Sequence, residues 1–236
     1  MCTVSFVNVN DTVIITSNRD EKIIRPSAIP PKEYTINGKN VIFPKDPKAG
    51  GTWFVVDANG TVLVLLNGAD EKHKVALPYS KSRGLVVLDI IGRPSPKDFW
   101  DEIDLENIEP FTLVLFQNGA LFQLQWNGNQ KEITSLDSRK NHIWSSSTLY
   151  PTAIREQRSK WFYSFLDANQ EISEMEMLRF HRYTEEKNQE NGLIINRNDE
   201  LKTLSITQYV MKKNKVAILH CDLIVQKEYR TSFITI

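Results

Sequence analysis

The second residue of the chain, Cys2, carries a thiol that could act as a nucleophile. If Met1 is removed, the same residue also has a free α-amine, whose ordinary pKa of about 7.7–8.0 leaves part of it neutral near pH 7. A neutral amine beside the thiol can take its proton, so one residue would supply both nucleophile and base. A cysteine at this position can equally be a small buried hydrophobic residue. On its own, Cys2 leaves both interpretations open.

A polar cluster, residues 18–21 (Asn-Arg-Asp-Glu), follows directly on an apolar segment. Polar and charged groups that end an apolar strand are costly to bury unless they are paired. A hairpin predicted over residues 3–17 would bring the cluster close to Cys2. There, Arg19 could lower the pKa of the thiol and Asp20 could orient the amine. A solvated turn is the usual fate of such a charge run and is the alternative interpretation.

Three further segments of the first third contain residues suited to a binding site. Gly51, in the Gly-Gly-Thr-Trp segment that ends at Trp53, allows a close approach of the backbone to a ligand or to another strand. Asn67 could donate its side-chain amide to a developing oxyanion, or it could simply be a turn residue before Gly68. The Pro-rich residues 29–47 predict a long loop, of the kind that often forms a binding lid.

The order of five short motifs resembles a known family. Met-Cys-Thr, Ser-Asn-Arg-Asp-Glu, Arg-Pro-Ser, Gly-Gly-Thr-Trp and Leu-Asn-Gly follow one another as they do in the NRDE family, also called the Transport and Golgi Organisation 2 family. The resemblance is specific over residues 1 to about 70 and looser over residues 143–161. It implies an α+β fold, a four-layer αββα sandwich of two antiparallel sheets, related to the N-terminal nucleophile (Ntn) hydrolases.

A remoter similarity, to the cysteine-type bile salt and penicillin V acylases, implies roles for individual residues. By that likeness Cys2 is the nucleophile, and Arg19 and Asp20 hold the charge around it. Asn67 corresponds to an asparagine of the oxyanion hole. The acylases have another asparagine in the second half of the chain, where this sequence has three serines, and Ser146 is the candidate donor there.

Other positions near these motifs are predicted to contact the substrate. They are Asn18, Arg25, Gly51 and Trp53. Arg230 is a candidate for a C-terminal acylase arginine by position only. The adjacent His220, Cys221 and Asp222 are tempting as a metal site or dyad, but neighbours on a strand face opposite ways, which favours a structural role.

Strand and helix patterns are segregated along the chain, which favours an α+β fold. Residues 84–92 fit a short buried helix or a strand, and Ser95 and Ser173 are predicted to cap helices. A longer amphipathic helix is predicted over residues 152–168. The predicted strands are 3–9, 12–17, 52–57, 61–66, 111–117, 120–127, 130–134, 201–211, 215–221 and 228–236. We expect the whole of residues 1–236 to form one domain.

The composition limits the class of function. Lys+Arg and Asp+Glu both number 29, so the formal net charge is zero and a broad nucleic-acid footprint is not expected. No apolar run reaches the roughly 18 residues of a membrane span. Residues 1–17 lack the features of a secretion signal and there are only two cysteines, so we expect a cytoplasmic protein. The four histidines show no metal spacing and no phosphate-binding glycine motif is present, so neither metal nor cofactor is predicted.

Two functions remain open. The first is an Ntn-type cysteine hydrolase that cleaves the carbon–nitrogen bond of a small-molecule amide. The second is a non-catalytic protein on the same fold that binds or carries a lipid or haem. In either case the expected partner is a small molecule, and a homodimer is left open.

Overall fold

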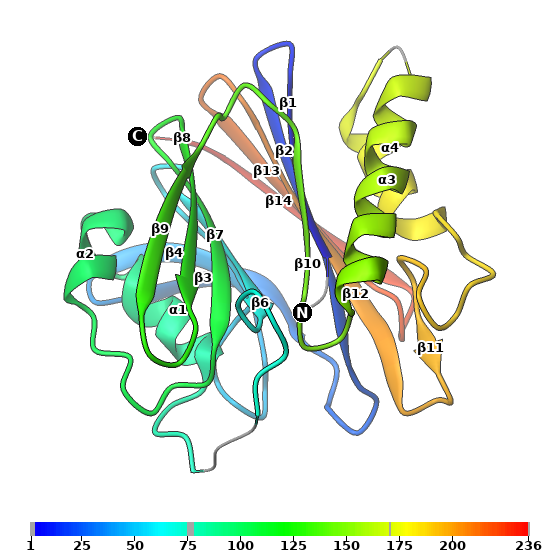
Figure 1. Ribbon diagram of the computed structural model, residues 1–236. Helices are drawn as coiled ribbons and strands as arrows, with labels where there is room; N and C mark the ends of the chain where they lie inside the picture. The colour runs from blue at the N-terminus through cyan, green and yellow to red at the C-terminus, as the bar shows by residue number, and fades with distance from the viewer. Residues whose placement is uncertain (1–2, 75–77, 170, 236) are drawn as a thin grey trace.

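Two antiparallel sheets face each other and helices cover their outer sides (Figure 1). The computed structural model describes residues 3–74, 78–169 and 171–235. Helices α1 and α2 lie outside one sheet, while α3 and α4 lie outside the other (Figure 1). The fold is therefore α+β with four layers, as predicted.

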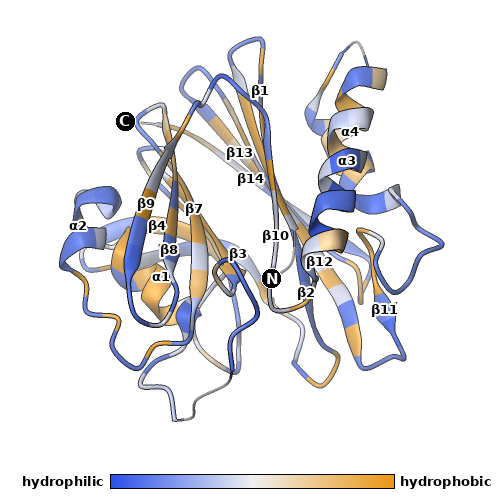
Figure 2. Ribbon diagram, viewed as in Figure 1, coloured by the Kyte–Doolittle hydropathy of each residue, from blue (hydrophilic) through white to orange (hydrophobic). Residues whose placement is uncertain are grey.

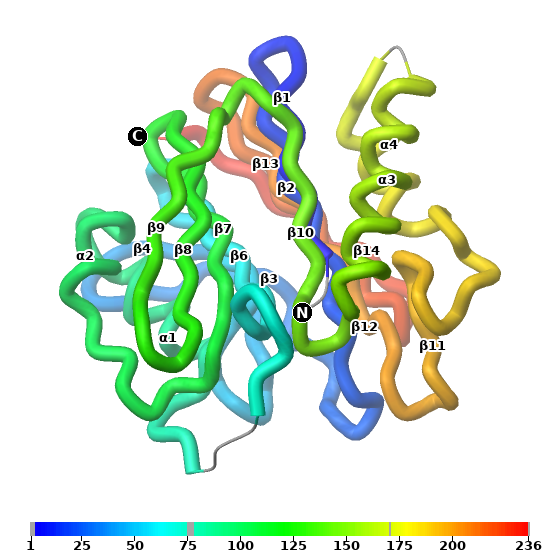
Figure 3. The backbone as a smooth tube through the Cα atoms, viewed as in Figure 1, coloured from blue at the N-terminus to red at the C-terminus, as the bar shows by residue number. Residues whose placement is uncertain are grey.

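The sheet that begins with the first strand has the order β10-β1-β2-β12-β13-β14, and β11 pairs with β12. Figure 3 shows β10 running alongside β1, which places a segment from the middle of the chain next to its start. The strands are β1 (Thr3–Val9), β2 (Thr12–Lys22), β10 (His142–Ser145), β11 (Asn196–Arg197), β12 (Leu201–Lys212), β13 (Lys215–Asp222) and β14 (Lys227–Ile234).

The second sheet is a meander in which each strand pairs with the next along the chain. Its strands are β3 (Ile29–Ile36), β4 (Lys39–Lys45), β5 (Phe54–Asp57), β6 (Val62–Asn67), β7 (Phe111–Gln117), β8 (Ala120–Trp126) and β9 (Lys131–Leu136). The helices are α1 (Arg83–Ile91), α2 (Pro96–Glu102), α3 (Thr152–Ala168) and α4 (Glu174–Tyr183).

The alternation of side chains along β1 and β2 explains the layers. Val4, Phe6 and Ile15 point toward the second sheet and join the main hydrophobic core. Val7 and Ile14, with the opposite parity, join a smaller core formed with α3 and α4. Figure 2 shows the hydrophobic residues concentrated in the strands and in α1, whereas α2 is largely hydrophilic. Both faces of this sheet are thus covered, and polar residues on it must find partners inside the protein.

Most predicted elements are confirmed. Residues 83–91 form a helix rather than a strand. Ser95 caps α2 by accepting a hydrogen bond from the Asp98 amide at 3.3 Å, and Ser173 caps α4 by accepting one from the Glu176 amide at 3.2 Å.

The predicted lid over residues 29–47 is wrong. Most of this segment is the β3–β4 hairpin, with Asn37 and Gly38 at its turn in the left-handed region, at φ 50° and 79°. The prolines of β3 are tolerated because β3 lies at the edge of the sheet and leaves one row of backbone groups unpaired. The strand β10 was also missed, and β2 runs five residues beyond its predicted end at Ser17.

Candidate functional site

The antiparallel pairing of β1, β2 and β10 brings the predicted site residues to one end of the sheet. Thr3 pairs with Asn18 on β2 and with Ser145 on β10. Cys2, the predicted nucleophile, lies outside the described residues. The chain that follows it therefore begins between the polar cluster of β2 and the serine segment after β10.

The polar cluster is inside the protein and is no solvated turn. Asn18, Arg19 and Asp20 are all buried within β2. Because neighbours on a strand face opposite ways, Arg19 points toward the second sheet, as Ile15 does, whereas Asn18 and Asp20 point toward the helices. One strand thus supplies polar groups to two separate environments.

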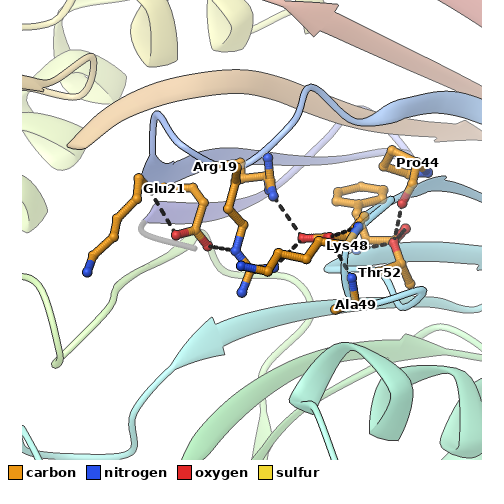
Figure 4. A network of polar contacts seen from close by, with 10 residues as sticks. Arg19, Glu21, Pro44, Lys48, Ala49 and Thr52 are labelled. Atoms are coloured by element: carbon orange, nitrogen blue, oxygen red, sulfur yellow. Dashed lines mark hydrogen bonds and ion pairs between the residues drawn. The ribbon is translucent and has the colours of Figure 1, made fainter. Parts of the chain in front are cut away.

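Arg19 is held by a carboxylate and an aromatic ring. Its Nη2 donates to Asp46 Oδ2 at 3.0 Å, and its guanidinium lies over the Trp53 ring, 4.3 Å from the centroid. Burial lowers the pKa of Arg19, against the attraction of Asp46. Figure 4 shows Arg19 and Glu21 in one network of polar contacts with Lys48 and Ala49 of the β4–β5 loop. This network fixes the guanidinium at the inter-sheet end of β2.

Asp46, which the sequence did not single out, is the centre of that network. It accepts hydrogen bonds from the backbone amides of Lys48 and Ala49 at 2.9 and 3.0 Å, and from Arg25 Nη1 at 2.7 Å. Burial alone would raise the pKa of Asp46, but these amides and the two arginines hold it below its ordinary value. Asp46 is therefore a carboxylate anion whose oxygens already accept hydrogen bonds from two arginines and two backbone amides.

A cavity of about 150 Å³ opens beside Arg19. Four other residues predicted for the site line it: Arg25, Gly51, Trp53 and Asn67. The cavity is also lined by Glu21 of the polar cluster and by three charged residues that the sequence did not indicate, namely Asp46, Arg83 and Glu109.

Gly51 is required where the cavity wall meets the start of α1. A Cβ atom added to Gly51 would lie 2.3 Å from the carbonyl carbon of Gly84. Two backbones therefore touch at this point, although the partner is the start of a helix and not the ligand or strand expected from the glycine pair. The contact brings Ser82 and Arg83, at the start of α1, into the cavity lining.

Asn67 and Ser146 are connected, but through the backbone of Asn67. The Ser146 hydroxyl donates to the Asn67 carbonyl oxygen at 2.8 Å and accepts from Thr148 Oγ1 at 2.9 Å. In the described part of the chain, no hydrogen bond engages the side-chain amide of Asn67. Ser146 lines a second cavity, of about 190 Å³, together with Gln125 and others. Ser146 is thus placed to position the end of β6.

Asn18 and Asp20 serve the helical side of the sheet. Asn18 donates to the carbonyl oxygens of His181 and Leu193 at 3.1 and 2.6 Å, and it does not line the cavity. Asp20 accepts from the Tyr150 hydroxyl at 2.7 Å and from Thr203 Oγ1 at 2.5 Å. The structure therefore separates these two residues from Arg19.

The remaining candidates lie apart from the cavity lining. His220 faces the inter-sheet core, 6.3 Å from the Trp53 ring, and burial lowers its pKa to about 4. Cys221 faces α4, where burial raises the pKa of its thiol to about 11. The opposite orientation of these neighbours is as predicted. Arg230 is exposed on β14, where it pairs with Glu228. Among the described residues, no group of three or more metal-binding side chains is close enough to hold a metal ion.

Comparison with known proteins now identifies the family. The family model "Transport and Golgi organisation 2" matches residues 1–236. The chain belongs to this family. No curated protein sequence matches it. Among its described residues, no helix is both long enough and apolar enough to cross a membrane.

Solved structures share the fold of this Transport and Golgi organisation 2 family member. The Caenorhabditis elegans N-acylethanolamine-hydrolyzing acid amidase ortholog matches with a TM-score of 0.53 and 11% identity, over 89% of this chain and 92% of that one. A mutant of conjugated bile acid hydrolase from Clostridium perfringens matches with a TM-score of 0.48 and 8% identity, over 99% and 96% of the two chains. The architecture is that of the Ntn hydrolases.

Proposed function

We propose that the protein is an Ntn-type cysteine hydrolase that cleaves the carbon–nitrogen bond of a small-molecule amide. The observation that carries the proposal is the position of Arg19. It is buried on the inter-sheet side of β2, level with the start of β1, and it shares a cavity with Asn67. The fold, which it shares with an acid amidase, supports the same reaction class.

The place of Arg19 at the start of β1 supports Cys2 as the nucleophile. Arg19 points toward the second sheet from β2, on the same side as Val4 and Phe6 of β1. One peptide bond joins Cys2 to Thr3, and Thr3 pairs with Asn18, the neighbour of Arg19. A guanidinium at this end of the strand would stabilise a thiolate next to it.

The proposed reaction has two halves. The α-amine of Cys2, freed by removal of Met1, takes the thiol proton, and the sulfur attacks the amide carbon. The side-chain amide of Asn67 donates to the oxyanion, the carbon–nitrogen bond breaks, and the leaving amine takes the proton from the α-ammonium. Water then attacks the thioester, with the α-amine again as base, so that a carboxylic acid leaves and the thiol is restored. Ser146 lies in the segment where the acylases have a second asparagine. It contributes to the oxyanion site only indirectly, because its hydroxyl holds the backbone of Asn67.

The carrier alternative is not favoured by this cavity. Its lining includes three arginines and three carboxylates, and its volume of about 150 Å³ is below the roughly 300–1,000 Å³ of pockets for drug-sized ligands. An acyl chain or haem would bury apolar surface against charged groups.

Cys2→Ala tests the proposal, with Cys221→Ala as the matched control. In a screen of small amides, Cys2→Ala is expected to abolish turnover, whereas Cys221→Ala keeps it because that buried thiol faces α4. A cysteine-directed electrophile at pH 7, mapped by mass spectrometry, should label Cys2 first, since the pKa of Cys221 is raised to about 11. Full turnover by Cys2→Ala on every active substrate, or intact Met1 on the active protein, would sink the proposal.

A further inference from the structure

The two terminal nitrogens of the buried Arg19 differ in their hydrogen bonding within the described part of the chain. Arg19 is 3% exposed and lines the cavity, yet within the described residues its Nη1 has no hydrogen-bond partner. The Asp46 carboxylate engages only Nη2. A buried charged donor without a partner is costly, so such groups are rare in folded proteins. An acceptor atom on a ligand in the cavity would satisfy this donor.

The neighbours of Arg19 indicate the kind of acceptor. Trp53 Nε1 is also buried without a partner in the described part of the chain, and Trp53 lines the same cavity. Arg25 and Arg83 add further guanidinium groups to the lining. A guanidinium is planar and presents paired N–H groups that match the two oxygens of a carboxylate or a phosphate.

The charges around the cavity distinguish between these two anions. Arg19, Arg25 and Arg83 are balanced by Glu21, Asp46 and Glu109. The Asp46 charge is engaged by two backbone amides and two arginines. Glu21 and Glu109 are half-buried at the cavity and would repel a second negative charge on the ligand. A single negative charge beside Arg19 is therefore favoured over the higher charge of a phosphate.

We propose that Arg19 binds the carboxylate of the substrate, which is then a small amide that also carries a carboxylate. The inference rests on the proposed amide hydrolysis and names its substrate class. The cavity of about 150 Å³ restricts the bound part to a few heavy atoms. Arg19 is then an anchor for the substrate as well as a charge beside the nucleophile, and Trp53, whose ring lies against the guanidinium, lines the same cavity.

The test measures binding without chemistry. Isothermal titration or ligand-observed NMR on the Cys2→Ala protein compares N-acetylglycine with its neutral primary amide, N-acetylglycinamide, and with inorganic phosphate. Since a hydrogen bond to a charged group is worth more than one between neutral groups, the acid should bind about tenfold or more tightly than the amide. This comparison needs no substitution in the cavity.

A pair of variants locates the effect. Arg19→Gln should remove the preference for the acid, and Arg139→Gln, at a side chain that is 87% exposed, should leave it unchanged. Any of four results overturns the inference. The acid and the amide could bind with equal affinity, or the acid could fail to bind at millimolar concentration. Phosphate could bind more tightly than the acid, or both variants could lose the preference for the acid to the same extent. Because binding is measured without the thiol, the two proposals can fail separately. If the protein hydrolyses only neutral amides, this inference is refuted and the catalytic proposal stands. If the protein binds the acid but its turnover does not depend on Cys2, only the catalytic proposal is refuted.

Discussion

His181 allows a quantitative prediction, because it is a buried histidine that the fold holds neutral. The ring lies between the first sheet and α4, where Nδ1 donates to Asn18 Oδ1 at 2.6 Å and Nε2 accepts from the Ser5 hydroxyl at 2.8 Å. Both ring nitrogens are used, and because the Asn18 oxygen can only accept, the neutral ring carries its proton on Nδ1. Burial, reinforced by the nearby charge of Arg158, lowers the pKa of His181 to about 3.

The magnitude follows from proton linkage. Below the ordinary pKa of 6.5, the unfolded chain binds a proton at this position that the folded protein does not bind. Stability is therefore highest above pH 6.5 and is lost as the pH falls, by roughly 1.4 kcal/mol per pH unit. Between pH 6.5 and 4.5 the loss from His181 is about 2 kcal/mol. His220, with a pKa of about 4, is expected to add a similar loss over most of this range.

The assay is urea unfolding at a series of pH values from 7 to 4.5. His181→Gln removes the titrating group, so its free energy of unfolding should fall less steeply as the pH falls, by the slope that corresponds to one proton. At pH 7 the variant should be less stable by about 1–3 kcal/mol because its hydrogen bonds are lost. His220→Gln serves as a second case on the other face of the sheet. An identical pH slope in the wild type and in His181→Gln, at unchanged m-value, would show that the reasoning is wrong.

Two substitutions test the packing around the site. Gly51→Ala should lower the free energy of unfolding by about 3 kcal/mol or more, because its Cβ would lie 2.3 Å from the Gly84 backbone. Gly119→Ala, with open space around it but a φ of 77°, should lower the free energy of unfolding by only about 1–2 kcal/mol. Equal melting temperatures for the two variants would contradict this. Arg158→Met removes the donors to Thr3 Oγ1 and to the Asn191 and Gly192 carbonyls, and it should lower the free energy of unfolding in urea by roughly 3 kcal/mol. The exposed Arg179→Met should change that free energy little. An Arg158→Met protein with unchanged stability would refute the role of these bonds.

The parts of the fold that local sequence determines could be predicted. Asn118-Gly119 marks the β7–β8 turn and Ser173 marks the start of α4, because turn and cap preferences act over a few residues. The β3–β4 hairpin was missed because its prolines were given more weight than the Asn37-Gly38 turn. Its edge position, which makes the prolines tolerable, is a property of the assembled sheet and has no signature in the segment itself.

The candidate site divides in the same way. Arg19, Arg25, Gly51, Trp53 and Asn67 line one cavity, as their shared motifs suggested, although their roles in function stay predictions. The partners that organise the cavity come from distant segments. Asp46 lies 27 residues from Arg19, and Glu109 comes from the segment before β7, so no local pattern relates either of them to the cluster.

The burial of the cluster shows why a run of polar residues in a strand can serve two purposes at once. In a sheet covered on both faces, successive residues enter different layers, so each charge needs its own partners. Arg19 finds Asp46 and Trp53 between the sheets, whereas Asn18 and Asp20 find His181 and Tyr150 beneath the helices. The two outward-facing residues fasten β2 to the helical layer, and this attachment holds the strand that presents Arg19 to the cavity. The same four-residue motif therefore combines a structural anchor with a charged group that lines the cavity, which a solvated turn could not do.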